Sequence, residues 1–270
     1  MSHFNPNFFL KLILYLLSGL IAISSQAQDE ARSELFQHSI LRFGGLERAD
    51  TTQKNIFLAF TGGDYNDEGK YIKKVLKQKR VSAHFFFTGD FYRSPDNYRL
   101  IKSLKKQRHY LGPHSDKHLL YAAWENRDSL LVTKEEFTID LLNNYKAMRP
   151  FGISPKDAPF FMPPYEWYNQ QISDWTAELG LILVNFTPGT RSNADYTTPD
   201  MGDRYISSTQ IYENILRYEN QSSNGLNGFI LLIHIGTNPA RRDKFYYKLP
   251  KLIDELRKRD YQFRLLSALE

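Results

Sequence analysis

Apolar and polar positions along residues 50–270 predict strands and helices in turn. Short apolar runs typical of buried strands are followed by stretches whose apolar residues recur every three or four positions, as on one helix face. The predicted strands cover residues 55–60, 83–88, 110–112, 160–161, 181–185, 229–233 and 262–265. The predicted helices cover residues 68–79, 96–107, 133–148, 170–179, 207–219 and 248–259.

Repeated strand–helix units indicate a parallel sheet with helices on its outside. About seven units favour an α/β fold built as a distorted, closed or partly closed (β/α) barrel, with an open doubly wound sheet as the alternative. Thr133 and Glu136 form a capping-box pattern at the start of the third predicted helix. His84 lies within a predicted strand and is expected in the core. No repeat or long linker divides residues 51–270, so we expect one domain there, preceded by an N-terminal extension at 28–50.

The first 27 residues carry a different pattern. Lys11 precedes an apolar stretch at 12–23, and Ser25-Gln26-Ala27 places small residues where a signal peptidase would cleave. We therefore expect a signal peptide at 1–27 and export to the periplasm or the cell exterior. The apolar stretch is short for a membrane span, so no stable span is expected after cleavage. A retained N-terminal anchor is the alternative.

Composition and charge exclude several kinds of site. The chain has no cysteine, which excludes disulfides, cysteine-bound zinc and a lipid-modified N-terminal cysteine. The formal net charge is +5, and removal of residues 1–27, which hold one lysine and no acid, leaves +4. This small charge, with no basic stripe or nucleic-acid-binding motif, argues against a nucleic-acid partner.

The best candidate for chemistry is the stretch Gly112-Pro113-His114-Ser115-Asp116-Lys117-His118. The four-residue spacing of its histidines would put both imidazoles on one face of a helical turn, where they can bind one cation. Gly112 and Pro113 mark the end of the preceding strand, and strand ends carry the functional residues of α/β folds. We therefore interpret His114 and His118 as two ligands of a metal site that a carboxylate completes. On an ordinary helix the same spacing would only form a solvated face.

Polar and metal-binding side chains also follow other predicted strands. They are found in Thr61-Gly62-Gly63-Asp64-Tyr65, in Pro163-Pro164-Tyr165-Glu166-Trp167-Tyr168, in the polar loop 185–195 and at His234. In a parallel barrel these strand ends converge on one face of the molecule. The sequence therefore predicts a single site built from several loops.

The order of these motifs resembles the polysaccharide deacetylase family, also called the NodB-homology or carbohydrate esterase family 4 domain, over residues 52–268. The His-Ser/Thr-x-x-His motif of that family is matched in full at residues 114–118, and Pro163-Pro164-Tyr165 and Ile233-His234 match in order and spacing. The resemblance implies a distorted (β/α) barrel and metal-assisted hydrolysis of N- or O-acetyl groups on a polysaccharide or oligosaccharide. It further implies a divalent cation, often zinc, on His114 and His118, with His234 as the general acid.

The chain departs from the family pattern where the family has Phe-Asp-Asp-Gly. Thr61 stands in place of the base and Gly62 in place of the ligand aspartate, while Met162 replaces the arginine that orients the base. The loss of the aspartates and the loss of the arginine belong together, because an arginine without its carboxylate partner would be an unpaired buried charge. We expect Asp64 to take the third ligand position, since the Gly62-Gly63 step can carry the backbone inward. The alternative is that Asp64 only caps the turn.

The remaining roles leave alternatives open. Glu166 is the better placed candidate for the base and Asp116 the other, although each could instead be an acid outside the reaction. Tyr165 and Trp167 are expected to contact a sugar, or else to form a packed aromatic lid. Arg191 is expected to meet an anionic group, or else to belong to a solvent-facing turn.

Two other functions fit the same residues. The first is a catalytically silent or weak sugar-binding relative that keeps the barrel and lacks the base. The second is hydrolysis of a carbon–nitrogen bond in a small amide, because the metal chemistry is not tied to sugars.

Overall fold

The structure is a computed structural model that describes residue 33 and residues 35–266. The predicted signal peptide at 1–27 and the first part of the predicted extension lie outside the described residues. Within the described part, no helix combines the length and the apolar character needed to cross a membrane.

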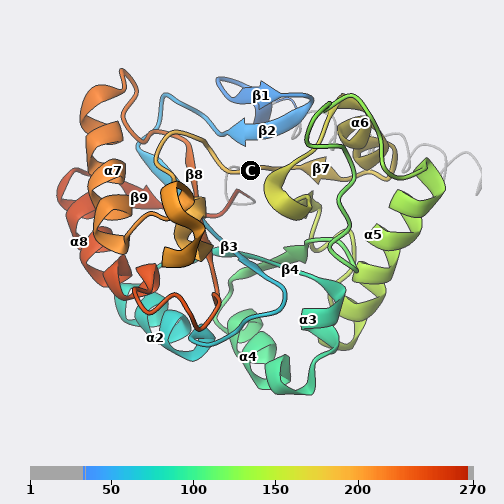
Figure 1. The fold of residues 1–270 in the computed structure, drawn as a ribbon, viewed down its shortest axis with the longest axis horizontal. Helices are drawn as coiled ribbons and strands as arrows, with labels where there is room; N and C mark the ends of the chain where they lie inside the picture. Colours follow the sequence, from blue (N-terminus) through green and yellow to red (C-terminus); the bar gives the residue numbers. More distant parts are fainter. Residues whose placement is uncertain (1–32, 34, 267–270) are drawn as a thin grey trace, which may run out of the picture.

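A parallel sheet occupies the centre of the fold (Figure 1). Its strand order is β5-β4-β3-β8, and β9 pairs with the start of β3. The strands of this sheet are β3 (Asn55–Gly62), β4 (His84–Phe87), β5 (Tyr110–Pro113), β8 (Phe229–His234) and β9 (Gln262–Phe263). Two smaller sheets are the parallel pair β6 (Phe160–Phe161) and β7 (Ile182–Leu183) and the antiparallel hairpin β1 (Ile40–Arg42) and β2 (Gly45–Arg48).

Single backbone hydrogen bonds connect these sheets into a distorted ring. They link the end of β6 to β5, the end of β7 to β2, and the end of β2 to the start of β8. The donor and acceptor pairs are Met162 and Pro113 (3.3 Å), Asn185 and Leu46 (2.8 Å), and Ala49 and Gly228 (2.9 Å). The predicted α/β fold with a distorted barrel is confirmed, and β2, which lies in the predicted extension, contributes to the ring.

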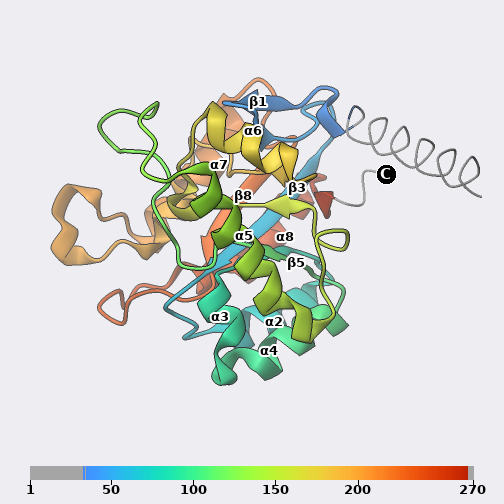
Figure 2. The ribbon, with the colours of Figure 1, turned by 90° about the vertical axis from the view of Figure 1, so that its right-hand side faces the viewer.

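Helices cover the outside of this ring (Figures 1 and 2). The helices are α2 (Gly69–Lys79), α3 (Gly89–Arg93), α4 (Pro95–Lys106), α5 (Lys134–Met148), α6 (Gln170–Glu178), α7 (Ser208–Gln221) and α8 (Leu249–Lys258). Every predicted helix is present with ends within about two residues of the prediction. The predicted capping box begins α5, because Thr133 Oγ1 accepts from the Glu136 N–H and Glu136 Oε2 accepts from the Thr133 N–H.

Buried apolar side chains of the strands form the core, and His84 lies among them. Phe60 of β3 stacks on Phe85 of β4 with 4.9 Å between ring centroids. His84 Nδ1 is 3.2 Å from the Leu58 carbonyl oxygen, and His84 Nε2 accepts from the Leu266 N–H at 2.9 Å. The neutral ring therefore satisfies both of its nitrogens, which confirms His84 as a core residue.

Candidate functional site

His114 and His118 lie in the loop after β5, and the prediction that they share a helical turn was wrong. The backbone of this loop is irregular, with left-handed φ angles of 72° at Ser115 and 55° at His118. The two imidazole rings nevertheless meet, with centroids 5.1 Å apart and planes at 62°. The expected pairing of the rings is thus present on a different backbone.

Side chains of α5 explain why this loop is not helical. Asn144 Oδ1 accepts from the His114 N–H at 2.8 Å. One turn earlier on α5, Asp140 accepts from the N–H groups of Asp116 at 3.3 Å and Lys117 at 3.0 Å. These bonds occupy backbone donors that a helical turn would direct to its own carbonyls. Asp140 and Asn144 therefore position the histidine loop.

The tautomer of His114 is set by its surroundings. Its Nδ1 is 2.8 Å from the Met162 carbonyl oxygen, which can only accept, so Nδ1 carries the hydrogen and Nε2 carries a lone pair. Burial, and then the neighbouring His118, lower the pKa of His114 well below its ordinary value. Burial also lowers the pKa of His118, against the opposing negative charge of Asp64. Both rings are thus neutral near pH 7, which is the form that binds a metal ion.

Glu166 approaches this pair from the loop after β6, in the short 3-10 helix η2 (Pro164–Glu166). Its Oε1 lies 4.0 Å from His114 Nε2, and its side chain is 10% exposed. Tyr165 and Glu166 have left-handed φ angles of 58° and 53°, which is unfavourable for residues other than glycine. Burial, with a smaller contribution from Asp195, raises the pKa of Glu166 to about 7 against the opposing charge of His234.

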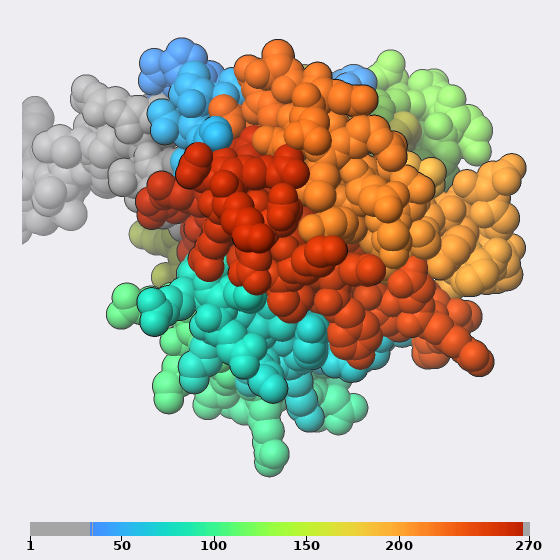
Figure 3. Space-filling model, turned by 90° about the vertical axis from the view of Figure 1, so that its left-hand side faces the viewer, coloured from blue at the N-terminus to red at the C-terminus, as the bar shows by residue number. Residues whose placement is uncertain are grey.

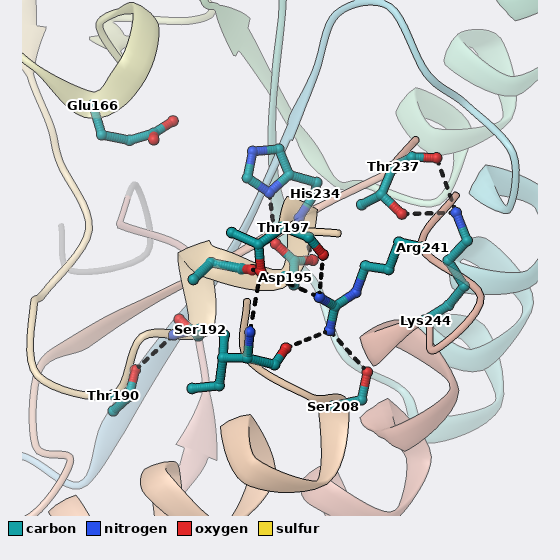
Figure 4. Close-up of polar contacts among 12 residues, drawn as sticks. Glu166, Thr190, Ser192, Asp195, Thr197, Ser208, His234, Thr237, Arg241 and Lys244 are labelled. Atoms are coloured by element: carbon teal, nitrogen blue, oxygen red, sulfur yellow. Dashed lines mark hydrogen bonds and ion pairs between the residues drawn. The ribbon is translucent and has the colours of Figure 1, made fainter. Parts of the chain in front are cut away.

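His234, the last residue of β8, forms a hydrogen-bonded pair with Asp195 of η3 (Ser192–Tyr196) (Figure 4). Its Nδ1 is 2.6 Å from Asp195 Oδ1, and its backbone N–H donates to Asp195 Oδ2 at 3.0 Å. Nδ1 therefore carries a hydrogen, and Nε2 is the nitrogen left for a ligand. Burial alone would lower the pKa of His234, but the charge and hydrogen bond of Asp195 raise it above its ordinary value.

Asp195 is a residue of the candidate site that the sequence analysis placed in a polar loop without a role. It lies 39 residues from His234 in the chain, so no local motif links the two. Arg241, which is fully buried, holds the segment that follows Asp195. Its guanidinium donates to the carbonyl oxygens of Thr197 at 2.6 Å and Ile206 at 3.0 Å (Figure 4).

Of the two aromatic residues predicted to contact a sugar, one is exposed beside His118 and the other is partly buried. Tyr165 is 45% exposed, and its ring centroid lies 4.4 Å from that of His118. Trp167 is partly buried, with the Arg127 guanidinium 3.4 Å from its ring centroid. The sequence analysis missed Trp124, which is 51% exposed and whose ring centroid lies 5.7 Å from that of Tyr165. Tyr165 and Trp124 thus form the exposed aromatic surface beside His118.

Arg191 lies on the other side of the site, beyond His234. It is exposed and lines a pocket of about 370 Å³ together with Tyr196 and Arg204. The Tyr196 ring centroid lies 5.5 Å from that of His234, so this pocket adjoins the His234–Asp195 pair. The surrounding segment, gold in the space-filling view, stands out from the surface (Figure 3).

The family model for polysaccharide deacetylases matches residues 48–184. The chain belongs to the polysaccharide deacetylase family. It is 25% identical over 217 residues to a peptidoglycan-N-acetylglucosamine deacetylase of Bacillus cereus, covering 80% of this chain and 88% of that protein. It is 34% identical over 148 residues to the peptidoglycan-N-acetylmuramic acid deacetylase of Bacillus subtilis, covering 54% of this chain and 51% of that protein.

Solved structures show the same fold at lower identity. A carbohydrate esterase family 4 pseudoenzyme from Bacillus anthracis superposes with a TM-score of 0.65 at 16% identity, covering 85% of this chain and 69% of that one. The family 4 carbohydrate esterase PdaA of Bacillus subtilis superposes with a TM-score of 0.64 at 22% identity, covering 88% of this chain and 87% of that one. These likenesses confirm the predicted NodB-like barrel fold.

In this member of the polysaccharide deacetylase family the end of β3 carries no carboxylate. Thr61 is buried and its hydroxyl has no hydrogen-bond partner in the described structure. A Cβ on Gly62 would lie 2.7 Å from Ile235 Cγ2 and 2.8 Å from Phe87 Cδ1, so a larger residue there would require repacking. Asp64 is exposed, and its carboxylate makes no hydrogen bond or ion pair with the described residues. Its role as third ligand stays a prediction.

The metal ion that the family resemblance implies finds a suitable but incomplete set of donors. Among the residues that the structure describes, no three histidine, aspartate or glutamate side chains lie close enough to form a ready metal site. Yet His114 directs a lone pair toward the Glu166 carboxylate, and imidazole nitrogen with carboxylate oxygen is a donor set that zinc accepts. His114, His118 and a carboxylate are thus residue types suited to a divalent cation, but the described side chains do not bring three donors together at one point.

Proposed function

We propose that the protein hydrolyses N- or O-acetyl groups on a glycan, with peptidoglycan as a candidate substrate. The observation that carries this proposal is the His234–Asp195 pair, which lies near Glu166 and thereby near His114 (Figure 4). A histidine oriented by a carboxylate is suited to proton transfer. The two peptidoglycan deacetylases among the similar proteins support the substrate class.

The side chains would divide the proton transfers between them. His234, held by Asp195 through Nδ1, would donate a proton from Nε2 to the leaving nitrogen or oxygen. The sequence-based assignment makes Glu166 the base, and a pKa of about 7 suits a group that accepts a proton near neutral pH. A divalent cation such as zinc, bound by His114, His118 and a carboxylate, would supply Lewis acidity at the acetyl carbonyl.

The proposal includes where the protein acts and what touches the sugar. The pattern at residues 1–27 supports export to the periplasm or the cell exterior, where a glycan of the cell envelope is accessible. The exposed ring of Tyr165 would stack on a sugar beside His118, and Arg191 would meet an anionic group near His234, which the ring contact and the pocket lining support. Trp167 would support this surface from beneath, together with Arg127.

A second candidate function is a catalytically silent, glycan-binding member of the family. Thr61 and Gly62, where the family pattern has two aspartates, favour it. A similar solved structure is described as a carbohydrate esterase family 4 pseudoenzyme, and another is a mutant of that pseudoenzyme with restored enzymatic activity.

Acetate release distinguishes the two candidates. The protein would be incubated with acetylated xylan, chitooligosaccharide and peptidoglycan fragments, with and without Zn²⁺ or Co²⁺. We expect metal-dependent release from at least one substrate, lost in His234→Asn and retained in His38→Asn. His38 is an exposed histidine whose left-handed φ of 59° asparagine also adopts, so it is a matched control. Glycan binding without acetate release from any substrate would establish the silent relative.

A further inference from the structure

Trp124 exposes its ring in the loop that follows the histidine motif. It is 51% exposed, and its ring centroid lies 5.7 Å from that of Tyr165, which is itself 45% exposed. Single exposed aromatic residues are ordinary on protein surfaces, but two adjoining ones beside a candidate site indicate a ligand contact. The Trp124 indole N–H has no hydrogen-bond partner among the described residues, so a donor is available at the edge of the exposed ring.

The loop that carries Trp124 is held in one shape by its own hydrogen bonds and by α5. The backbone N–H of Ala123 donates to the Ser129 carbonyl at 2.9 Å. The hydroxyl of the buried Tyr121 donates to Asp140 Oδ2 at 2.5 Å, and Asp140 is also the carboxylate that positions the histidine loop. Trp124 is therefore fixed relative to the histidine loop, and a ligand would bind it without first ordering the chain.

Trp167 braces Trp124 and is not itself free to contact a ligand on both faces. The Arg127 guanidinium lies 3.4 Å from the ring centroid of Trp167 and 4.5 Å from that of Phe43. Trp167 Nε1 donates to the Ala123 carbonyl at 3.2 Å, and the Trp167 ring centroid lies 5.2 Å from that of Trp124. The second aromatic contact with a sugar, which the sequence analysis assigns to Trp167, therefore falls to Trp124.

Tyr165 and Trp124 present their rings at nearly a right angle. The two ring planes make an angle of 79°, so one pyranose cannot stack on both of them. Tyr165 is the ring beside the candidate site, because its centroid lies 4.4 Å from that of His118. Trp124 contacts Tyr165 and Trp167 but, within the described part of the chain, no histidine ring. A sugar on Trp124 is therefore a neighbour of the sugar beside His118.

A chain of pyranose sugars is the ligand that this surface fits. The indole ring offers an apolar face and a polar edge, which match the apolar C–H face and the hydroxyl rim of a pyranose. The cation that contacts this cluster, Arg127, donates to the Tyr168 carbonyl at 2.5 Å and lies against two rings, so an anionic group is not required. Residues 119–132, green in Figure 2, project from the same side of the molecule as the gold segment that includes Arg204, as expected of loops that flank an extended ligand.

We propose that Trp124 binds the sugar adjacent to the one that carries the acetyl group and thereby makes the protein prefer long glycan chains to short ones. The inference rests on the proposed function for the kind of ligand. It assigns this specificity to a loop that lies between the sequence motifs and belongs to none of them.

Glycan binding tests the inference without any need for catalysis. Isothermal titration calorimetry would compare chitooligosaccharides, acetylated xylooligosaccharides and peptidoglycan glycan fragments, each as a series from a single sugar to a hexasaccharide. We expect affinity to rise with chain length in the unaltered protein. Trp124→Ala should lose about tenfold in affinity for the longest chain, as for an anchoring aromatic residue, and stay within about threefold for the single sugar.

Two further variants complete the design. Trp124→Phe keeps an aromatic ring at the position, and we expect its affinity for the longest chain to lie between those of Trp124→Ala and the unaltered protein. Tyr98→Ala removes another exposed aromatic side chain, 44% exposed on α4, and should leave the whole length series unchanged. Thermal melts of all variants should match that of the unaltered protein, because Trp124 is exposed; if Trp124→Ala melts lower, Trp124→Phe decides the question.

The outcomes separate this inference from the proposed function. Equal losses for short and long chains in the Trp124 variants would overturn it, as would unchanged affinities or no binding of any series by the unaltered protein. Self-association that Trp124→Ala abolishes in sedimentation analysis would also overturn it, because a second copy would then cover the ring. Length-dependent binding through Trp124 without acetate release would leave it standing and refute the proposed activity. Acetate release with affinities that ignore Trp124 would do the reverse.

Discussion

The carboxylate of Asp195 accepts hydrogen bonds from both the ring and the backbone of His234, at 2.6 Å from Nδ1 and 3.0 Å from the backbone nitrogen. The two contacts fix the position of the carboxylate relative to the strand end and the orientation of the ring. They also favour the protonated ring, because the carboxylate stabilises its positive charge. His234, at the end of β8, is therefore held in the orientation and charge state that the proposed proton donor needs.

Asp195→Asn should reduce kcat by about 100-fold or more, the range that general acid catalysis contributes. The substitution removes the negative charge that raises the pKa of His234, so that pKa should fall. A general acid must be protonated to donate its proton. As the pH is raised, the activity of the variant should therefore begin to decline at a lower pH than the activity of the unaltered protein. The measurement is kcat against pH for both proteins. An unchanged kcat and an unchanged alkaline limb would show that Asp195 does not act on His234 during the reaction.

Glu166→Gln should raise the thermal stability of the metal-free protein. The carboxylate is mostly buried without a hydrogen-bond donor, whereas the glutamine amide can donate toward His114 Nε2. The expected gain in the free energy of unfolding is about 1 kcal/mol. Urea unfolding of chelator-treated protein measures it. A clear loss of stability in the metal-free variant would argue against a strained carboxylate.

The buried His84 should make the fold sensitive to mild acid. Burial lowers its pKa from 6.5 to about 4, and protonation would place a hydrogen on the nitrogen that accepts from Leu266. Between these two pH values the unfolded chain binds more protons, so the stability contribution is complete above pH 6.5 and is lost as the pH falls toward about 4. The full effect is on the order of 3 kcal/mol.

Urea unfolding of the unaltered protein and of His84→Gln, measured from pH 4.5 to 7, checks this expectation. Glutamine is less stabilising at neutral pH because it fits the core less well, but it does not titrate, so the variant should lose less stability on acidification. His109, whose pKa burial also lowers to about 4, should retain its own dependence in both proteins. Identical pH dependence in the two proteins would exclude His84 as a source.

Gly62→Ala should be more destabilising than Gly63→Ala, although the two glycines are neighbours. A Cβ at Gly62 would lie 2.7 Å from a methyl carbon of Ile235, whereas at Gly63 the nearest contact is 3.6 Å from Thr88 Cγ2. We expect a loss of about 1–3 kcal/mol for the first and little change for the second. Thermal and urea unfolding measure the difference. Equal stability of both variants would mean that β3 and β8 can move apart enough to accept a side chain.

Much of the framework followed from local patterns in the sequence. The helices end within about two residues of their predicted bounds because their apolar spacing and end signals act locally, as Thr133 and Glu136 show. The shape of the histidine loop did not follow, because its backbone donors bond to Asp140 and Asn144, 23 to 30 residues further along the chain. A spacing rule for isolated helices cannot include such partners.

The candidate site was predictable to a similar extent. The order of the motifs located His114, His118 and His234, since His114 directly follows β5, His118 lies in the same loop and His234 ends β8. The pairing of His234 with Asp195 and the exposure of Trp124 depend on how separate loops meet, and nothing in the neighbouring residues encodes it. Burial of the Glu166 carboxylate likewise depends on the whole site.

The buried Arg241 anchors Thr197 and Ile206 and thereby separates two parts of one stretch of chain. Asp195 lies before this anchor and stays with His234, while residues 199–204, most of them exposed, lie between the two anchored positions. Changes in the length or sequence of that projection need not displace the His234–Asp195 pair. The fold thus contains a segment that can diverge, or be exchanged by design, while the geometry of the His234–Asp195 pair is inherited unchanged.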